Sequence, residues 1–206
     1  MKPADNKIYL ASKSPRRREL LRQIGVDFEL LLLRDQSPRG PEVSEEVHPG
    51  EKAEDYVLRV TREKAEYACT TMLWRRLPVR TVLAADTTVT IDGRILGKPA
   101  DSVEAAEMLR ALSGRTHQVL TSVAVRRDET TYQLLQTSEV TFAVLTDAMI
   151  RAYCATSEPY DKAGGYGIQG MAAVFIQHIS GSHSGIMGLP LHETAQLLHQ
   201  AGITIL

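Results

Sequence analysis

Short apolar runs of strand length alternate along this chain with stretches whose apolar residues recur at helical spacing. These patterns predict strands at residues 8–11, 28–33, 81–91, 94–96, 119–125, 139–144 and 172–179. They predict helices at residues 15–24, 52–74, 101–113, 146–156 and 191–201. Asp92-Gly93 is a strong hairpin signal, so at least two of the strands should pair antiparallel. Helices interleaved with strands in this way predict a mixed-sheet α/β or α+β architecture.

Size and charge limit the class of protein. The 206 residues, 43% of them hydrophobic, can bury a sizeable core, and we expect one domain over residues 1–206. A net charge of -1 argues against a broad nucleic-acid interface. The two cysteines lack CxxC spacing, which favours a reducing compartment. No segment approaches the roughly 18 consecutive apolar residues of a membrane helix, so we expect a cytoplasmic protein without a membrane partner.

Three arginines at residues 16–18 stand where a helix should begin, directly after a short strand and a serine-containing turn. A helix N-terminus is already positive, so this charge is favourable mainly if an anion binds in front of it. Consecutive helical residues point about 100° apart, so at most two of the three can face one ligand. We select Arg16 and Arg17, with Ser12 and Ser14 as further donors. The alternative is a solvated helix face with incidental ion pairs.

Asp86 ends an apolar run of the predicted strand at residues 81–91. An unpaired carboxylate there would be costly, which favours a metal ligand or a general base, although a structural aspartate that caps a turn is the alternative. Lys98 lies just beyond the predicted hairpin and could reach the same place. Lys64 is ambiguous, because most lysines on helices are solvated.

Residues 157–170 are rich in glycine, with four glycines among the last seven residues. Glycines let the backbone approach a ligand closely, although glycine-rich segments are usually only loops. Gln169 offers a paired donor and acceptor that suits the edge of a nucleotide base.

These motifs, taken in order, resemble the Maf family of nucleoside triphosphate pyrophosphatases. The resemblance covers nearly the whole chain and rests on residues 11–17, 62–65, 85–87, 97–99, 158–164 and 188–190. It implies a two-lobed α/β fold of the Maf and ITPase type, in which helices flank a central mixed sheet and a ligand cleft. It also implies a divalent cation, Mg²⁺ or Mn²⁺, and hydrolysis of a nucleoside triphosphate to the monophosphate and pyrophosphate.

Residues 166–170 and 185–190 look like the dTTP/UTP branch of that family, whereas the branch acting on 7-methyl-GTP differs in this segment. The resemblance makes Asp86 the catalytic proton acceptor. It assigns base specificity to Arg16, Thr87 and Gln169, and phosphate binding to Ser12, Arg17, Lys64 and Lys98. The family often carries an acidic pair after its second strand, but here Asp35 is followed by Gln36. The acid that shares a metal with Asp86 is therefore left open between Asp35 and Glu42.

The resemblance also implies a biological role and its alternatives. Removal of dTTP, UTP or modified pyrimidine nucleotides would prevent their misincorporation into nucleic acids, and a homodimer is consistent with the family. The alternative is a nucleotide-binding regulator of septum formation with little catalysis, which a rearranged loop around Asp35 would favour. Binding of nucleic acid through the arginine cluster is disfavoured by the net charge.

Overall fold

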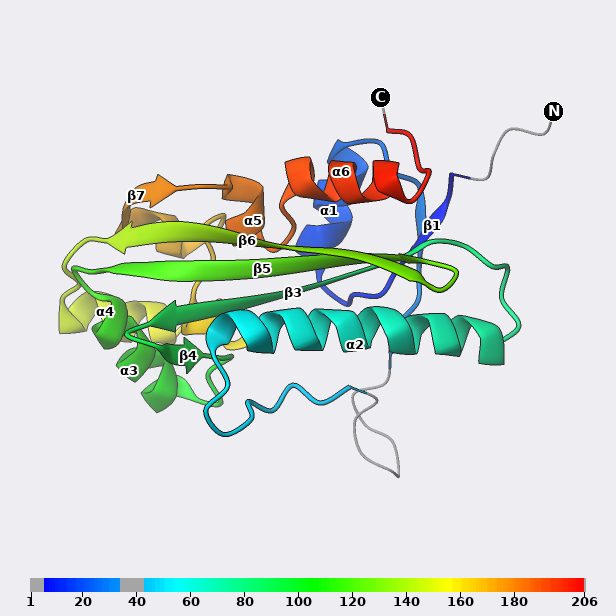
Figure 1. Ribbon diagram of the computed structural model, residues 1–206. Coiled ribbons are helices and arrows are strands. Elements are labelled where there is room, and N and C mark those ends of the chain that lie inside the picture. Colours follow the sequence, from blue (N-terminus) through cyan, green and yellow to red (C-terminus); the bar gives the residue numbers. More distant parts are fainter. Residues whose placement is uncertain (1–5, 34–42, 206) are drawn as a thin grey trace.

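One mixed β-sheet runs through the computed structural model, which describes residues 6–33 and 43–205 (Figure 1). Six of its seven strands within these residues follow the order β2-β1-β3-β5-β6-β7, and the seventh, β4, pairs with β3 beside this path. The strands are β1 (Ile8–Leu10), β2 (Phe28–Leu30), β3 (Val82–Ile91), β4 (Arg94–Leu96), β5 (Thr116–Arg127), β6 (Thr130–Phe142) and β7 (Ile176–Ser180). β1 is parallel to β2 and β3, and the other pairs are antiparallel. The predicted fold class is confirmed.

Helices cover both faces of this sheet. They are α1 (Pro15–Gln23), α2 (Ala53–Trp74), α3 (Ser102–Leu112), α4 (Asp147–Cys154), α5 (His183–Met187) and α6 (Leu191–Gln200). Short 3-10 turns, η1 (Pro159–Asp161), η2 (Ala163–Gly165) and η3 (Met171–Phe175), connect the last part of the chain. Side chains cap two of these helices at their N-termini, since that of Ser14 accepts from the N–H of Arg17 and that of Asp101 accepts from the N–H groups of Val103 and Glu104.

The alternation of side chains along β3 assigns its residues to two faces. Val82 and Ala84 pack in one cluster with Ala65 and Ala68 of α2, which runs along the sheet in Figure 1. Leu83 and Ala85 pack in another cluster with Leu21 of α1 and Leu198 of α6. Because side chains of a strand alternate between faces, Asp86 continues the face towards α2 and Thr87 the face towards α1.

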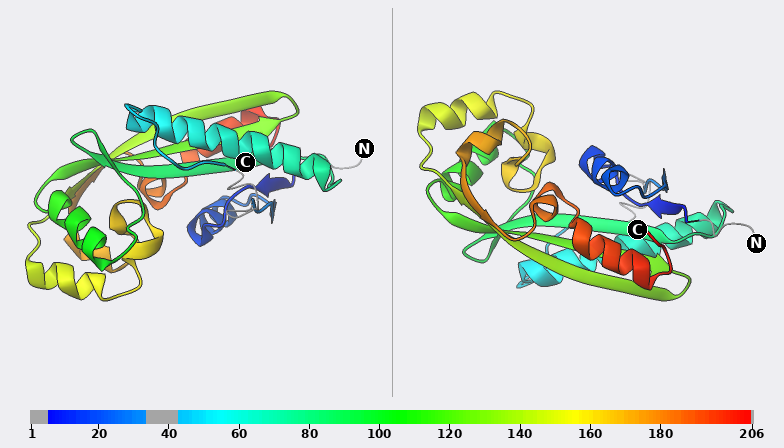
Figure 2. Two further views of the ribbon diagram at one scale, coloured as in Figure 1. Left: turned by 90° about the horizontal axis from the view of Figure 1, so that it is seen from below. Right: turned by 90° about the horizontal axis from the view of Figure 1, so that it is seen from above.

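A further core lies at the other end of the sheet. It joins α3, α4 and η3 to the far ends of β3, β5 and β6, around Leu109, Phe142 and Tyr153. Figure 2 shows α1, β1 and β2 at one end of the sheet, and α3, α4 and the 3-10 turns at the opposite end. The prediction of a single domain over residues 1–206 stays a prediction.

Several predicted boundaries are wrong, for physical reasons. Residues 172–175 of the predicted strand 172–179 belong instead to the turn η3, because Ala172 and Phe175 are buried in the core, and only the segment Ile176–Ser180 pairs with β6. The predicted strand 28–33 ends its ladder at Leu30. β6 begins at Thr130 rather than at residue 139, and its first half is half-buried, with Tyr132, Leu134 and Leu135 standing among polar residues and packing against the core. Helix α5 is short and follows a glycine, and it was not predicted.

Candidate active site

The edge of β3 that faces β1 and β4 is open at its middle. β1 pairs with β3 at Val82 and Leu83, and β4 pairs with it from Val89 to Ile91. In the part of the chain that the structure describes, no strand pairs with this edge between those two points. A cleft of about 920 Å³ has the middle of β3 in its wall. Side chains of a central strand are thereby accessible to a ligand.

The cleft collects predicted site residues from distant parts of the chain. The predicted residues that line it are Ser12, Ser14, Arg16, Arg17, Lys64, Asp86, Thr87, Lys98 and Gln169. Arg18 is not among the residues of its wall, in agreement with the limit that helix geometry sets on the arginine cluster. Asp35 and Glu42, the predicted alternatives for a second metal ligand, lie outside the described residues.

Lys64 joins two carboxylates at the floor of the cleft. Its Nζ lies 2.6 Å from Oδ1 of Asp86 and 2.6 Å from Oε1 of Glu45. Lys64 comes from α2, Asp86 from β3, and Glu45 from the segment that precedes α2. The side chains of Lys64 and Asp86 are 16% and 14% exposed, so this contact is largely shielded from water, whereas Glu45 is 48% exposed.

The charges of this trio stabilise one another. Burial alone would lower the pKa of the Lys64 ammonium, but the charges of Asp86 and Glu45 outweigh it, and the pKa lies above its usual value. Burial would raise the pKa of the Glu45 carboxyl, but Lys64 and then Lys98 and Arg17 hold it below its usual value. Glu45 is therefore ionised and Lys64 protonated at neutral pH.

Arg17 ties three segments together on the other side of β3. Its Nε donates to the carbonyl of Gly188 at 2.7 Å, and its two terminal nitrogens donate to Oγ of Ser12 and Oγ1 of Thr87 at 3.2 and 3.1 Å. Burial lowers the pKa of its guanidinium, which remains charged. The guanidinium has more N–H donors than these three partners use. Arg17 can thus hold the cleft in shape and still donate to a phosphate.

Arg16 reaches across the cleft to η1. Its Nη1 lies 3.4 Å from Oδ2 of Asp161, whose other oxygen accepts from Nζ of Lys162 at 2.5 Å. The carboxylate of Asp161 is 61% exposed, so the ion pair with Arg16 is weak and easily exchanged. Arg16 is available to a ligand at the mouth of the cleft.

Close packing within the protein requires at least two of the glycines in residues 164–170. A Cβ at Gly164, where φ is +69°, would lie 3.0 Å from side-chain carbons of Val89. A Cβ at Gly170 would lie 2.3 Å from Oε1 of Glu158, which accepts hydrogen bonds from the Tyr153 hydroxyl and the Ala172 N–H. Gln169 itself is exposed and lines the cleft.

Tyr166 connects this segment to a buried histidine. Its hydroxyl lies 2.7 Å from Nε2 of His117 on β5, and both rings contact the ring of Phe142 edge to face. Among the described residues, Nδ1 of His117 has no hydrogen-bond partner. Burial lowers the pKa of His117 to about 4, so its imidazole is neutral at neutral pH. His117 does not line the cleft, but it supports Tyr166, which does.

Glu45 is the site residue that the sequence reasoning missed. It belongs to an acidic pair, Glu45-Glu46, in the polar segment between β2 and α2, and this pair was the available signal. Within the described residues, no group of three or more His, Cys, Asp or Glu side chains could hold a metal by itself. The oxygens of Glu45 and Asp86 nevertheless converge on one cation, the Lys64 ammonium.

Comparison with known proteins shows the family of this chain. The family model described as "Maf-like protein" matches residues 7–201. Proteins named dTTP/UTP pyrophosphatase are 56% identical in Aromatoleum aromaticum, over 98% of both chains, and 57% identical in Ralstonia nicotianae, over 96% of this chain and 95% of the relative. The structure of the Staphylococcus aureus Ham1 protein matches 66% of this chain and 72% of its own with 17% identity and a TM-score of 0.43, too low to establish a shared fold. No helix of the described residues is long and apolar enough to cross a bilayer.

Proposed function

This chain belongs to the Maf family, and from that premise we propose that it hydrolyses dTTP and UTP to the nucleoside monophosphate and pyrophosphate. The contact of Lys64 with Asp86 and Glu45 is the observation that carries the proposal. This contact places charged side chains at the floor of the cleft. Ser12, Arg17 and Lys98 line the same cleft and can donate to phosphates. The names of the relatives support the same activity, because these proteins match this chain over nearly its full length.

In the proposed reaction, Asp86 orients a water molecule for attack on the α-phosphorus and accepts its proton. The bond from the water oxygen to phosphorus forms as the bond to the bridging oxygen of the leaving pyrophosphate breaks. Lys64, Arg17 and Lys98 stabilise the charge on the phosphoryl oxygens. Arg16, Thr87 and Gln169 contact the nucleoside and select the base.

The donor set of the cleft fits a divalent cation. Mg²⁺ at nucleotide sites usually takes one or two carboxylates and completes its shell with phosphate oxygens and water. Asp86 and Glu45 are two such carboxylates, and they already share a cation in Lys64. They would hold Mg²⁺ or Mn²⁺, which would supply positive charge against the triphosphate. The assignment of Asp35 as a metal ligand stays a prediction, because this residue lies outside the described residues.

The test is pyrophosphate release from dTTP, UTP, dCTP, GTP and 7-methyl-GTP, with Mg²⁺, with Mn²⁺ and with EDTA. We expect metal-dependent release that favours dTTP and UTP and is lost in Asp86→Asn. Asp92→Asn is the matched control, since it is the same change in the turn of the β3–β4 hairpin, outside the cleft. Near-normal turnover by Asp86→Asn would remove Asp86 from its role.

Nucleotide binding without release from any substrate would instead favour the regulator of septum formation. Protection of cells against misincorporation, a cytoplasmic location and a homodimer stay predictions.

A further inference from the structure

Glu45 reaches the cleft from a segment without regular secondary structure. Residues 43–51 precede α2 and contain neither helix nor strand. No ladder or helical hydrogen bond therefore fixes the backbone of Glu45. The placement of its carboxylate on Lys64 depends on contacts that the segment makes with the rest of the protein.

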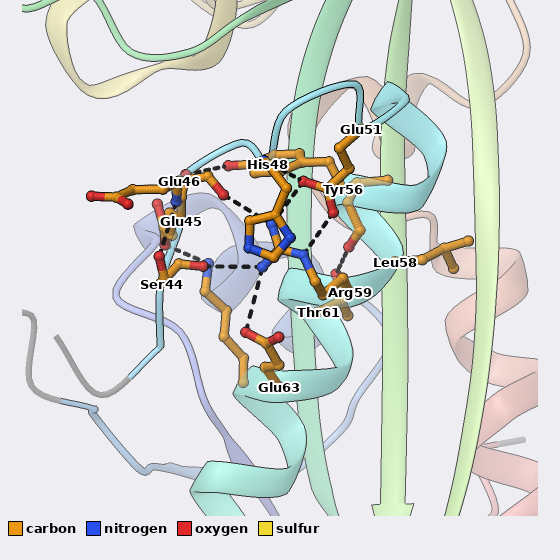
Figure 3. Close-up of polar contacts among 12 residues, drawn as sticks. Ser44, Glu45, Glu46, His48, Glu51, Tyr56, Leu58, Arg59, Thr61 and Glu63 are labelled. Atoms are coloured by element: carbon orange, nitrogen blue, oxygen red, sulfur yellow. Dashed lines mark hydrogen bonds and ion pairs between the residues drawn. The ribbon is translucent and has the colours of Figure 1, made fainter.

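Arg59 of α2 supplies most of these contacts, as Figure 3 shows. Its terminal nitrogens donate to the carbonyl of Glu46 at 2.9 Å and to the carbonyl of Ser44 at 3.4 Å. These are the two residues on either side of Glu45. Nε and Nη2 also donate to the two carboxylate oxygens of Glu51 at 2.7 and 2.9 Å. One guanidinium therefore holds both flanks of Glu45 and the end of the segment.

Two further bonds complete the arrangement. The hydroxyl of Tyr56, also on α2, donates to the carbonyl of Glu45 itself at 3.1 Å. Glu51 accepts from the N–H of His48 at 3.0 Å, which closes the segment on itself. The side chains of Arg59 and Glu51 are only 20% and 9% exposed, so their paired contact differs from an ordinary surface ion pair. Three successive carbonyls, from Ser44 to Glu46, thus accept from α2.

We propose that Arg59 is a positioning residue for the cleft: by binding the carbonyls on both sides of Glu45, it holds the Glu45 carboxylate on Lys64 beside Asp86. The expected change in kcat rests on the proposed function, whereas the expected effect of Arg59 on residues 44–51 does not. Arg59 does not line the cleft and acts only through Glu45. Lysine cannot replace it, because a single ammonium lacks the planar fork that reaches two carbonyls and a carboxylate together.

The first measurement is amide hydrogen exchange of residues 44–51 in the nucleotide-free protein. Arg59→Lys should exchange faster there than the wild type, while the rest of α2 keeps its protection. Glu63→Gln is the matched control, because Glu63 contacts the same guanidinium at 3.6 Å but belongs to α2 and holds no part of the segment. Unchanged exchange in Arg59→Lys would overturn the proposal. Tyr56→Phe, which removes the single bond to the Glu45 carbonyl, gives a milder test in a variant that should fold.

The second measurement is a double-mutant cycle with Glu45→Gln. Residues that orient a ligand group typically change activity about 10- to 100-fold, and we expect a fall in kcat of that size in Arg59→Lys. In the Glu45→Gln background the same change should have little further effect, because Arg59 would have no carboxylate left to position. An equal loss in both backgrounds would overturn the proposal and leave Arg59 a purely structural role.

The two measurements separate failure of this proposal from failure of the proposed function. A wild-type protein that releases no pyrophosphate would contradict the pyrophosphatase activity, and the exchange of residues 44–51 would still decide whether Arg59 holds the segment. Binding of Mn²⁺ to the nucleotide-free protein, followed by electron paramagnetic resonance, adds a readout without turnover. Weaker binding in Arg59→Lys and Glu45→Gln than in Glu63→Gln supports the proposal, and equal binding in all three contradicts it.

Discussion

Asp86 and Thr87 are consecutive residues of β3 whose side chains serve opposite sides of the cleft. Asp86 accepts from Lys64 of α2, and Thr87 accepts from Arg17 of α1. The alternation of a strand produces this division, and the open edge of β3 exposes both side chains. One dipeptide thereby joins the acidic floor of the cleft to its arginine-lined wall.

Arg17→Lys should destabilise the protein, because lysine cannot bond Gly188, Ser12 and Thr87 together. Lost hydrogen bonds of a charged, shielded group cost about 2 kcal/mol of unfolding free energy. Urea denaturation measures this loss. Arg18→Lys, the same change one residue further and outside the cleft, should stay within about 0.5 kcal/mol of the wild type. Equal losses of unfolding free energy in the two variants would show that the hydrogen bonds of Arg17 do not stabilise the fold.

Gln169→Glu should change the choice of base more than the rate. A glutamine amide can both accept from N3–H and donate to O4 of uracil or thymine, whereas a carboxylate can only accept. The discrimination lost with such a pair is about 1–3 kcal/mol, so kcat/KM for UTP and dTTP should fall about 10-fold or more relative to dCTP. Gln177→Glu adds the same charge at an exposed position of β7 outside the cleft and should leave the ratio unchanged. An unchanged ratio in Gln169→Glu would remove this residue from base selection.

Patterns in the sequence predicted the strand that carries Asp86 and the helix that carries Arg16. The apolar run before Asp86 marks a buried strand, and the serine and proline before Arg16 mark a helix start, so local patterns placed both residues correctly. Glu45 could not be placed in this way. Its segment has no periodicity, and its position follows from the contacts of Arg59 and Tyr56, which only the folded chain brings together.

The polar first half of β6 shows the same limit in the fold. Gln133 lies on a face where its side chain bonds the carbonyl of Leu58 on α2 and the hydroxyl of Ser122 on β5. These bonds satisfy a polar side chain that stands beside the partly buried Tyr132 and Leu134, and such a mixture of polar and apolar residues gives no clear strand pattern in the sequence. Turn η3 is the opposite case. Its apolar residues resemble a strand in the sequence, but they pack into the core from a 3-10 turn.

Lys64→Met should separate metal binding from turnover. The ammonium lies against the oxygens of both Asp86 and Glu45, so it opposes a divalent cation at the same carboxylates. Its removal should tighten Mn²⁺ binding to the nucleotide-free protein and at the same time lower pyrophosphate release about 100-fold, since a phosphate contact is lost. Electron paramagnetic resonance and a pyrophosphate assay measure the two effects.

Lys52→Met is the control for Lys64→Met, because Lys52 is exposed and lies outside the cleft. It should change neither quantity. Weaker Mn²⁺ binding in Lys64→Met would show that Lys64 orients the two carboxylates rather than opposing a cation beside them.

His117 should make the folded protein sensitive to mild acid. Burial lowers its pKa to about 4 from an ordinary value of 6.5. Between these values the unfolded chain binds a proton that the folded protein does not, so stability falls as the pH falls through this range. The loss from about pH 7.5 to about pH 5 should be about 2 kcal/mol of unfolding free energy. Urea denaturation at the two pH values measures it.

Carboxylates also begin to titrate near pH 5, so the test compares variants rather than the wild type alone. His117→Gln removes the titrating ring from the core and should lose about 2 kcal/mol less than the wild type over the same range. His178→Gln, at an exposed position of β7 away from the core, should lose as much as the wild type. Equal acid sensitivity of His117→Gln and the wild type would mean that the imidazole does titrate in the folded protein. The core at the start of β5 would then have to hold a charged ring whose Nε2 contacts the Tyr166 hydroxyl and whose Nδ1 has no hydrogen-bond partner among the described residues.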